Sequence, residues 1–197
     1  MRFNWRHFIS VALLSVSAVA SASSYKTQAS LEGTYAVPAA GTVEVGFSPR
    51  GSGEALVVKA IESAHQSIKI ASYSFTSENV VQALWRAKIQ RHVNIYLVAD
   101  QKDNLQEGST ARQAIPAFTA LMQAGIEVRV NGNYPIMHNK FMVIDGVTVE
   151  TGSFNYTKAA ATKNAENVIV FWSNPRLALV YDNEWNRLYQ ESQLFRP

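Results

Sequence analysis

The sequence contains no cysteine, so the chain can form neither a disulfide bond nor a thiolate metal site, and it has no cysteine nucleophile. Charged residues are also few, at 17%, whereas 47% of the residues are hydrophobic. This composition argues against intrinsic disorder and describes a globular protein. At 197 residues, the chain fits one domain with a sizeable core.

The apolar stretch at 8–20 falls short of the roughly 20 residues that a membrane-spanning helix needs. It follows a short basic leader and precedes the small-residue sequence Ala20-Ser21-Ala22. These three parts are typical of a secretory signal, so we predict a signal peptide at 1–22. The alternative is an uncleaved membrane anchor. Cleavage after Ala22 would leave a periplasmic or secreted protein without stable membrane association.

The chain lacks a strong excess of charge of one sign. It has 18 basic and 15 acidic residues, a formal net charge of +3. Arg2 and Arg6 lie in the predicted signal peptide, and subtracting them leaves 16 basic against 15 acidic residues, or +1. A polyanionic partner such as DNA would therefore have to be attracted by a local cluster of basic residues.

Residues 23–41 show little hydrophobic periodicity, and we predict a flexible lead-in there. From 42 to 197, strand and helix patterns alternate, which predicts a layered α/β domain. The expected strands are 42–47, 67–75, 93–100, 126–130 and 167–172, and the expected helices are 54–65, 78–91, 111–124 and 175–191.

Two details of this pattern carry specific expectations. The polar stretch 101–109 follows a continuous apolar strand, so we expect a loop that either contacts substrate or is a solvated connection. Pro116 is expected near the first turn of its helix, because proline in a helix interior removes a hydrogen bond.

The stretch around His138 combines groups that suit an anion. His138 and Lys140 share one face if the chain is extended, since strand side chains alternate. A His-x-Lys pair alone is commonly two solvated surface residues. Here, however, it leads into an apolar run at 141–144, and after a hairpin Gly152-Ser153-x-Asn155 adds hydroxyl and amide groups. The combination is typical of a phosphate site with its own nucleophile.

Asp145 completes a His-x-Lys-x4-Asp pattern but falls on the opposite face of a regular strand from His138 and Lys140. We therefore expect Asp145 to hold the hairpin or the motif loop in shape, although it belongs to the candidate catalytic set.

The full pattern, from His138 through Asn155, resembles the signature of the phospholipase D superfamily, and most of all its small bacterial Nuc-type endonucleases. The resemblance runs from about residue 43 to the C-terminus and implies a mixed β-sheet flanked by helices. It also implies that His138 forms a covalent phosphohistidine while Lys140, Ser153 and Asn155 bind the phosphate. Glu166 would hydrogen-bond the catalytic histidine and fix its tautomer.

In the family that the chain resembles, two such motifs face each other. This chain has one, because neither His65 nor His92 is followed by a lysine two places on. A homodimer with two His138 side chains across a two-fold axis would supply the second copy. His65 and His92 are expected at helix ends or on the surface.

The resemblance implies a nonspecific endonuclease acting on DNA, with RNA an open second substrate. No cofactor is expected, and no carboxylate set has the spacing of a divalent metal site, which favours a metal-independent reaction. The alternatives are a phospholipase D-type hydrolase acting on phosphatidyl lipids and a non-catalytic DNA-binding module.

Overall fold

The computed structural model describes residues 32–106 and 109–197. The chain divides into two compact units, Met1–Ala36 and Val37–Pro197. The predicted signal peptide and residues 23–31 of the lead-in lie outside the described residues. Within the second unit, the end of the lead-in meets the α/β domain, since the Asn174 side chain donates to the Pro38 carbonyl at 3.4 Å.

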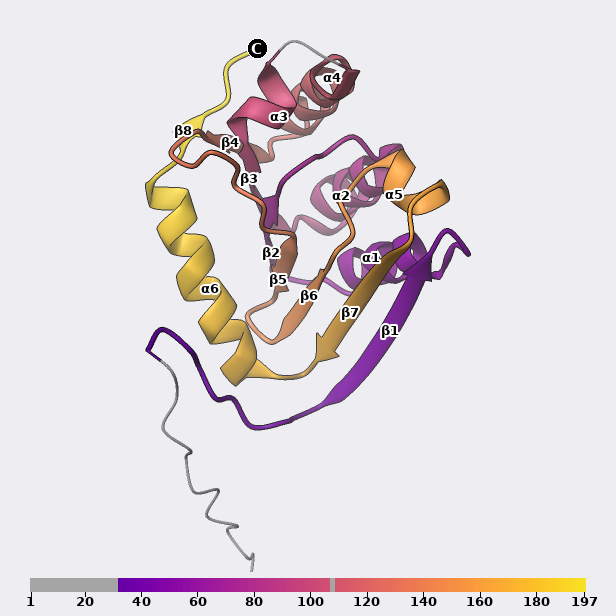
Figure 1. The fold of residues 1–197 in the computed structure, drawn as a ribbon, viewed down its shortest axis with the longest axis vertical. Coiled ribbons are helices and arrows are strands. Elements are labelled where there is room, and N and C mark those ends of the chain that lie inside the picture. The colour runs from indigo at the N-terminus through magenta and orange to yellow at the C-terminus, as the bar shows by residue number, and fades with distance from the viewer. Residues whose placement is uncertain (1–31, 107–108) are drawn as a thin grey trace, which may run out of the picture. The chain divides into compact units, whose positions relative to one another are not determined.

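The second unit is built on one eight-stranded sheet with strand order β1-β7-β6-β5-β2-β3-β4-β8 (Figure 1). Strands β2, β3 and β4 pair in parallel, and the remaining neighbours pair antiparallel. The mixed sheet predicted from the resemblance is therefore confirmed. In chain order the elements are β1 (Thr42–Ser48), α1 (Ser52–Glu62), β2 (Ser67–Ser72), α2 (Glu78–Arg91), β3 (Asn94–Asp100), α3 (Gln101–Leu105), α4 (Ser109–Gln123), β4 (Glu127–Asn131), β5 (Phe141–Ile144), β6 (Thr148–Gly152), α5 (Lys158–Thr162), β7 (Glu166–Trp172), α6 (Pro175–Gln190) and β8 (Gln193–Leu194).

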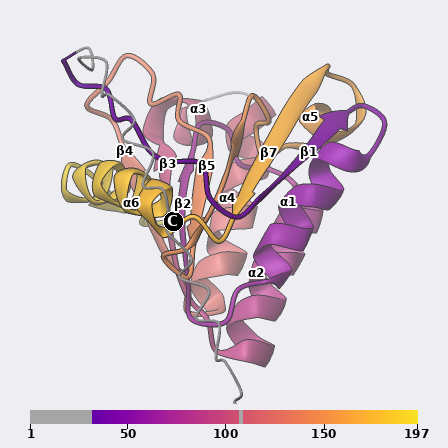
Figure 2. The same ribbon diagram turned by 90° about the horizontal axis from the view of Figure 1, so that it is seen from below.

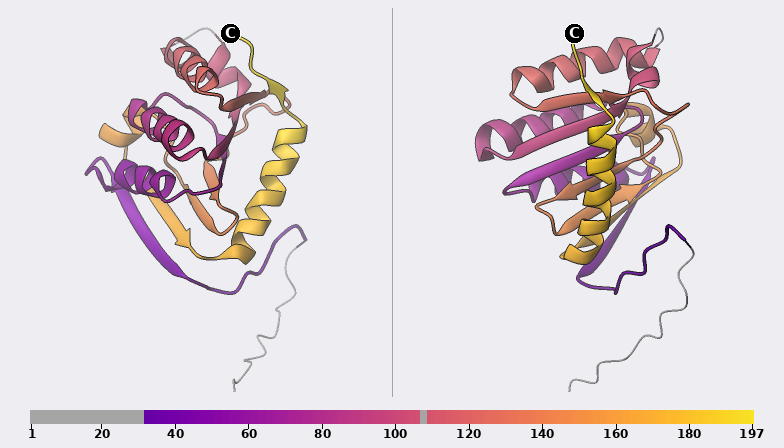
Figure 3. Two further views of the ribbon diagram at one scale, coloured as in Figure 1. Left: turned by 180° about the vertical axis from the view of Figure 1, so that it is seen from behind. Right: turned by 90° about the vertical axis from the view of Figure 1, so that its left-hand side faces the viewer.

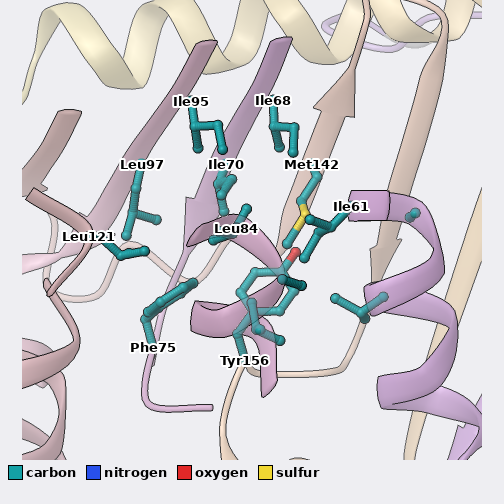
Figure 4. Close-up of a cluster of buried hydrophobic side chains, with 14 of the residues drawn as sticks. Ile61, Ile68, Ile70, Phe75, Leu84, Ile95, Leu97, Leu121, Met142 and Tyr156 are labelled. Carbon is teal, nitrogen blue, oxygen red and sulfur yellow. The ribbon is translucent and has the colours of Figure 1, made fainter. Parts of the chain in front are cut away.

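The sheet is the middle of three layers. Helices α1, α2 and α4 cover one face, and α6 covers part of the other, as Figure 2 shows with the sheet between them. Figure 3 shows α6 lying across the strands. The larger hydrophobic core fills the space between the sheet and the three helices, and Figure 4 shows part of it, including Phe75, Leu84, Met142 and Tyr156. A smaller core under α6 contains Trp185 and Leu188.

Helix starts follow capping rules that the sequence already indicates. The Ser77 side chain accepts a hydrogen bond from the Val80 amide at the start of α2. The Asn174 side chain accepts from the Leu177 amide at the start of α6, where Pro175 occupies the first turn. These signals explain why α2 and α6 begin where the sequence predicts.

Two sequence-based expectations were wrong. The stretch 101–109 is not wholly a loop, because it opens with α3, whose N-cap Asp100 accepts a hydrogen bond from the Asp103 amide at 2.7 Å. Pro116 lies inside α4 rather than near its first turn. Helix α4 buries Phe118 and Leu121 completely, so packing of this apolar stripe outweighs the hydrogen bond that proline removes.

Among the described residues, no helix is both long enough and apolar enough to span a membrane.

Candidate active site

The predicted site residues gather at one edge of the sheet because of strand direction. The parallel strands β2 and β3 both end at this edge, with Ser72 opposite Ala99. Strand β5 starts there, since Phe141 pairs with Ala71, and β6 ends there, since Thr151 pairs with Phe141. Strand β7 also starts at this edge, and its first residue, Glu166, pairs with the last residue of β1.

His138 and Lys140 lie in an irregular segment directly before β5, not within a strand as predicted. They nevertheless meet at one place, the ring of Tyr73. The His138 and Tyr73 ring centroids are 4.6 Å apart at an interplanar angle of 61°. The Lys140 ammonium lies 5.4 Å from the Tyr73 centroid and donates to the His138 carbonyl at 2.9 Å. His138 is exposed, whereas Lys140 is 8% exposed.

The environment of Lys140 is that of a cation taken partly out of water. Burial lowers the pKa of Lys140, and the negative charges of Glu166 and Asp103 act in the opposite direction. The two carboxylates therefore favour the ammonium form, and their influence places them electrostatically within reach of Lys140. A phosphate bound here would meet a poorly solvated positive charge.

Ser153 and Glu166 form a second, connected part of the site. The Ser153 hydroxyl donates to the Glu166 carboxylate at 2.5 Å and accepts from the Asn167 amide at 3.1 Å. Asn164 donates to the other oxygen of Glu166 at 3.0 Å. The hydrogen bond predicted between Glu166 and His138 is absent from the described part of the chain, where Glu166 is held by these two side chains instead.

The Gly152-Ser153-x-Asn155 turn depends on its glycine. A Cβ atom at Gly152 would come within 2.1 Å of the Asn167 carbonyl oxygen, so another residue would push β6 away from β7. Asn155 is half-buried, and its Oδ1 atom is buried without a hydrogen-bond partner in the described residues. This oxygen is a hydrogen-bond acceptor that the described residues leave unused, whereas binding of an anionic phosphate would use the NH₂ group of the same side chain.

Asp145 lies at the opposite end of β5. Its carboxylate accepts hydrogen bonds of 2.8 Å from the backbone amides of His65, Gln66 and Ser67. This contact joins the β5–β6 hairpin to the connection between α1 and β2. The structure thus separates Asp145 from the other predicted site residues, in agreement with the alternation argument.

Sequence reasoning missed three residues that organise the site: Tyr73, Asp100 and Asn104. Asp100 is 1% exposed and accepts from the Met137 amide at 2.7 Å, which fixes the segment before His138. Asn104 is fully buried and donates to the Tyr73 carbonyl at 2.5 Å. One signal was present, since Asp100 is a carboxylate at the end of an apolar strand.

The remaining histidines lie apart from this cluster. His65 follows α1 and its side chain is 83% exposed, and His92 is the C-cap of α2 with φ of 57°. Both positions agree with the prediction of helix ends. In residues 32–106 and 109–197, no group of three or more His, Cys, Asp or Glu side chains is placed to hold a metal ion.

Comparison with known proteins identifies the family. The model described as "Cardiolipin synthase, PLD-like domain" matches residues 57–189, which include every predicted site residue. The chain belongs to the phospholipase D superfamily. The signature motif of this phospholipase D-like domain therefore lies at the edge of the sheet that holds His138, Lys140 and Ser153.

Several relatives are similar over most of the domain. A phospholipase D family member, Nuc from Salmonella typhimurium, is 42% identical, with a TM-score of 0.73, and the match covers 79% of this chain and 99% of that one. "Phospholipase D" of Rickettsia typhi is 33% identical over 71% of this chain and 64% of that protein. "Mitochondrial cardiolipin hydrolase" of Xenopus laevis is 31% identical over 65% and 57%, respectively. The chain thus matches less than two thirds of the length of these last two relatives.

Proposed function

We propose that this protein is a phosphodiesterase that cleaves DNA, with His138 as the nucleophile. The observation that carries this proposal is the convergence of His138, Lys140, Ser153 and Asn155 at one edge of the sheet. An imidazole can attack phosphorus, and a partly desolvated ammonium, a hydroxyl and a side-chain amide can donate hydrogen bonds to the phosphate oxygens.

The reaction proceeds in two displacements. A nitrogen of His138 forms a bond to phosphorus, and the phosphorus–oxygen bond to the departing alkoxide breaks. A second histidine gives its proton to the alkoxide and then takes one from the attacking water. The water oxygen forms its bond to phosphorus as the phosphorus–nitrogen bond breaks, which restores His138. The ammonium of Lys140 and the NH₂ group of Asn155 donate to the non-bridging oxygens through both steps.

Local charge supports a nucleic acid as the substrate. Arg50, Lys102, Lys158 and Lys163 are exposed in segments that follow strand ends at the site's edge of the sheet. None of them is ion-paired to a carboxylate among the described residues. Four exposed cations without a carboxylate partner can attract a polyanion to this edge although the net charge of the chain is small. The near-complete coverage of Nuc at 42% identity agrees with this choice.

The names of other relatives favour a second candidate substrate, a phosphatidyl lipid. The Rickettsia relative is called phospholipase D and the Xenopus relative cardiolipin hydrolase. A phosphatidyl lipid is also a phosphodiester, so the same His138 chemistry would apply. The two candidates differ in what surrounds the phosphate, not in the attacking group.

We also propose that the active species is a homodimer, because one chain supplies one His-x-Lys motif and the reaction uses two histidines. The uncovered face of β1 supports this assembly. Val43, Val45 and Phe47 are 50%, 52% and 55% exposed, and they point away from α1 in a row that ends at Phe47, opposite Asn167 of β7. For 1–22 we retain the proposal of a secretory signal, which would send the mature enzyme to the periplasm or outside the cell.

One parallel incubation tests the function. Purified protein is offered plasmid DNA and phosphatidyl lipid vesicles, each with excess EDTA, and His138→Asn is the matched control. We expect plasmid cleavage by the wild-type protein in EDTA and a loss of at least about 10³-fold in His138→Asn. Lipid cleavage alone would replace the DNA assignment, and activity that disappears in EDTA and returns with Mg²⁺ would refute the metal-independent mechanism.

A further inference from the structure

Tyr73 is the side chain that His138 and Lys140 share. It lies between β2 and α2 and is half-buried. Its ring makes an edge contact with the His138 imidazole at 4.6 Å and lies 5.4 Å from the Lys140 ammonium. No hydrogen bond is found on the His138 side chain within the described residues, and the Tyr73 ring is an aromatic contact placed to orient the imidazole.

The contact between the two rings is built into the fold by α3. Asn104 accepts from the Phe75 amide at 3.0 Å and donates to the Tyr73 carbonyl, which fixes the segment that carries Tyr73. Asp100 accepts from the Met137 amide and thereby fixes the segment that carries His138. Both Asp100 and Asn104 are buried. One helical turn therefore sets the separation of the two rings.

We propose that Tyr73 is a positioning residue that holds the His138 imidazole at the angle needed to attack phosphorus. This inference rests on the proposed function and extends it to a residue outside the motif. Aromatic rings prefer edge-to-face and offset arrangements, so this contact favours one orientation of the imidazole over others. A misdirected nucleophile lowers the rate of attack without weakening substrate binding.

The ring, not the hydroxyl, makes both contacts. Burial, the negative charge of Asp103 and a hydrogen bond of the hydroxyl to the Asp103 side chain raise the pKa of Tyr73, so the side chain stays neutral at the pH of an assay. Phenylalanine at this position would keep the ring, whereas leucine would keep apolar volume and lose it. The pair Tyr73→Phe and Tyr73→Leu therefore separates orientation of His138 from simple filling of space.

The kinetic test uses bis(p-nitrophenyl) phosphate, a phosphodiester that is neither nucleic acid nor lipid. We expect Tyr73→Leu to lower kcat at least about 10-fold with KM within about threefold, and Tyr73→Phe to stay within about threefold in both. Tyr96→Leu is the control, since Tyr96 is also half-buried and makes an edge contact, to Trp185, under α6. Equal kcat in Tyr73→Leu and wild type would overturn the proposal.

An NMR measurement tests the ring contact without relying on activity. In the wild-type protein we expect a nuclear Overhauser effect between the Tyr73 and His138 rings and a ring-current shift of the His138 protons. Tyr73→Leu should lose that shift, Tyr73→Phe should keep it, and the signals of His65 and His92 should not move. A wild-type protein inactive on every phosphodiester would refute the proposed function, but absence of the Overhauser effect would refute the role of Tyr73.

Discussion

Asp145 occupies the left-handed region of backbone space, with φ of 52°, at the turn between β5 and β6. Its carboxylate accepts three backbone hydrogen bonds from the connection between α1 and β2. The residue therefore links two segments that are distant in sequence, and this role accounts for an aspartate at the last position of the motif without any contact with phosphate.

If Asp145 is a structural residue, its substitution should lower the stability of the protein but not its activity. Asp145→Ala should lower the free energy of unfolding by about 1–3 kcal/mol, because three amide donors lose their acceptor. Asp145→Asn should cost less, since asparagine tolerates the left-handed conformation and keeps one oxygen. Urea denaturation measures both changes.

Measuring the enzymatic activity of the same Asp145 variants is the second part of this test. Well below the melting temperature, both variants should keep kcat within about threefold of wild type, whereas Lys140→Ala should lose at least about 100-fold. A 100-fold loss in a folded Asp145→Asn would mean that this carboxylate takes part in the reaction after all.

The sequence predicts the motif residues of the site, but it does not predict the residues that support them. The spacing of His138 and Lys140 predicts that they meet, and they do so even outside a regular strand. Tyr73 could not be predicted, because its contact with His138 depends on two buried side chains of the α3 turn. Nothing in the local pattern around Tyr73 indicates which distant ring it will touch.

Among the elements, β6 carries a buried carboxyl group. Glu150 is 1% exposed, pairs with Met142 and Val170, and accepts a hydrogen bond from the Tyr156 hydroxyl at 2.6 Å. Burial raises the pKa of Glu150 to about 8, against the smaller opposing effect of the Tyr156 hydrogen bond. At neutral pH the folded protein therefore holds Glu150 protonated inside the larger core.

This buried acid predicts how stability depends on pH. The pKa of Glu150 is higher in the folded chain than the ordinary glutamate value of 4.5, so the folded state binds a proton that the unfolded state releases. As the pH rises from about 4.5 to about 8, the free energy of unfolding should therefore fall by up to about 1.4 kcal/mol per pH unit.

Glu150→Gln isolates this effect, because the amide cannot ionise. Urea denaturation at pH 5, 6, 7 and 8 should show Glu150→Gln gaining stability relative to wild type as the pH rises. Glu62→Gln, on the exposed surface of α1, is the control for loss of a carboxyl group elsewhere. A constant difference between Glu150→Gln and wild type across the series would contradict a buried, protonated Glu150.

Element prediction succeeded where one physical signal dominated. Apolar patterns and capping residues located the first five elements of the domain to within a few residues: β1, α1, β2, α2 and β3. It failed at α3, which is too short for its apolar pattern to be recognised, and inside α4, where burial of Phe118 and Leu121 overrides the effect of Pro116. Both failures reflect tertiary contacts that local patterns do not contain.

At the scale of the whole molecule, one face of β1 is an exposed apolar surface at the edge of the sheet. Strand β1 is an edge strand, and α6 does not cover the row formed by Val43, Val45 and Phe47. Edge strands with exposed apolar rows are commonly covered by a partner. The row ends at Phe47, which pairs with Asn167, the residue after Glu166, so a second copy seated on it would lie at the end of the sheet that holds Glu166.

This arrangement predicts that Phe47→Asp gives a folded monomer with little activity, because two charges would face each other across a two-fold axis. Light scattering coupled to gel filtration should find twice the mass of one chain for wild type and for the control Leu179→Asp. Leu179 is 61% exposed on α6 and does not belong to the row on β1. A fully active, monomeric wild-type protein would refute the shared site.

Mixed dimers test whether both histidines are needed. When wild-type and His138→Asn chains are denatured together in equal amounts and refolded, random pairing leaves about one quarter of the dimers with two His138 side chains. If each reaction uses both, the mixture should have about a quarter of the activity of the same total amount of wild-type protein. Independent sites would instead give about a half, because every wild-type chain would work regardless of its partner.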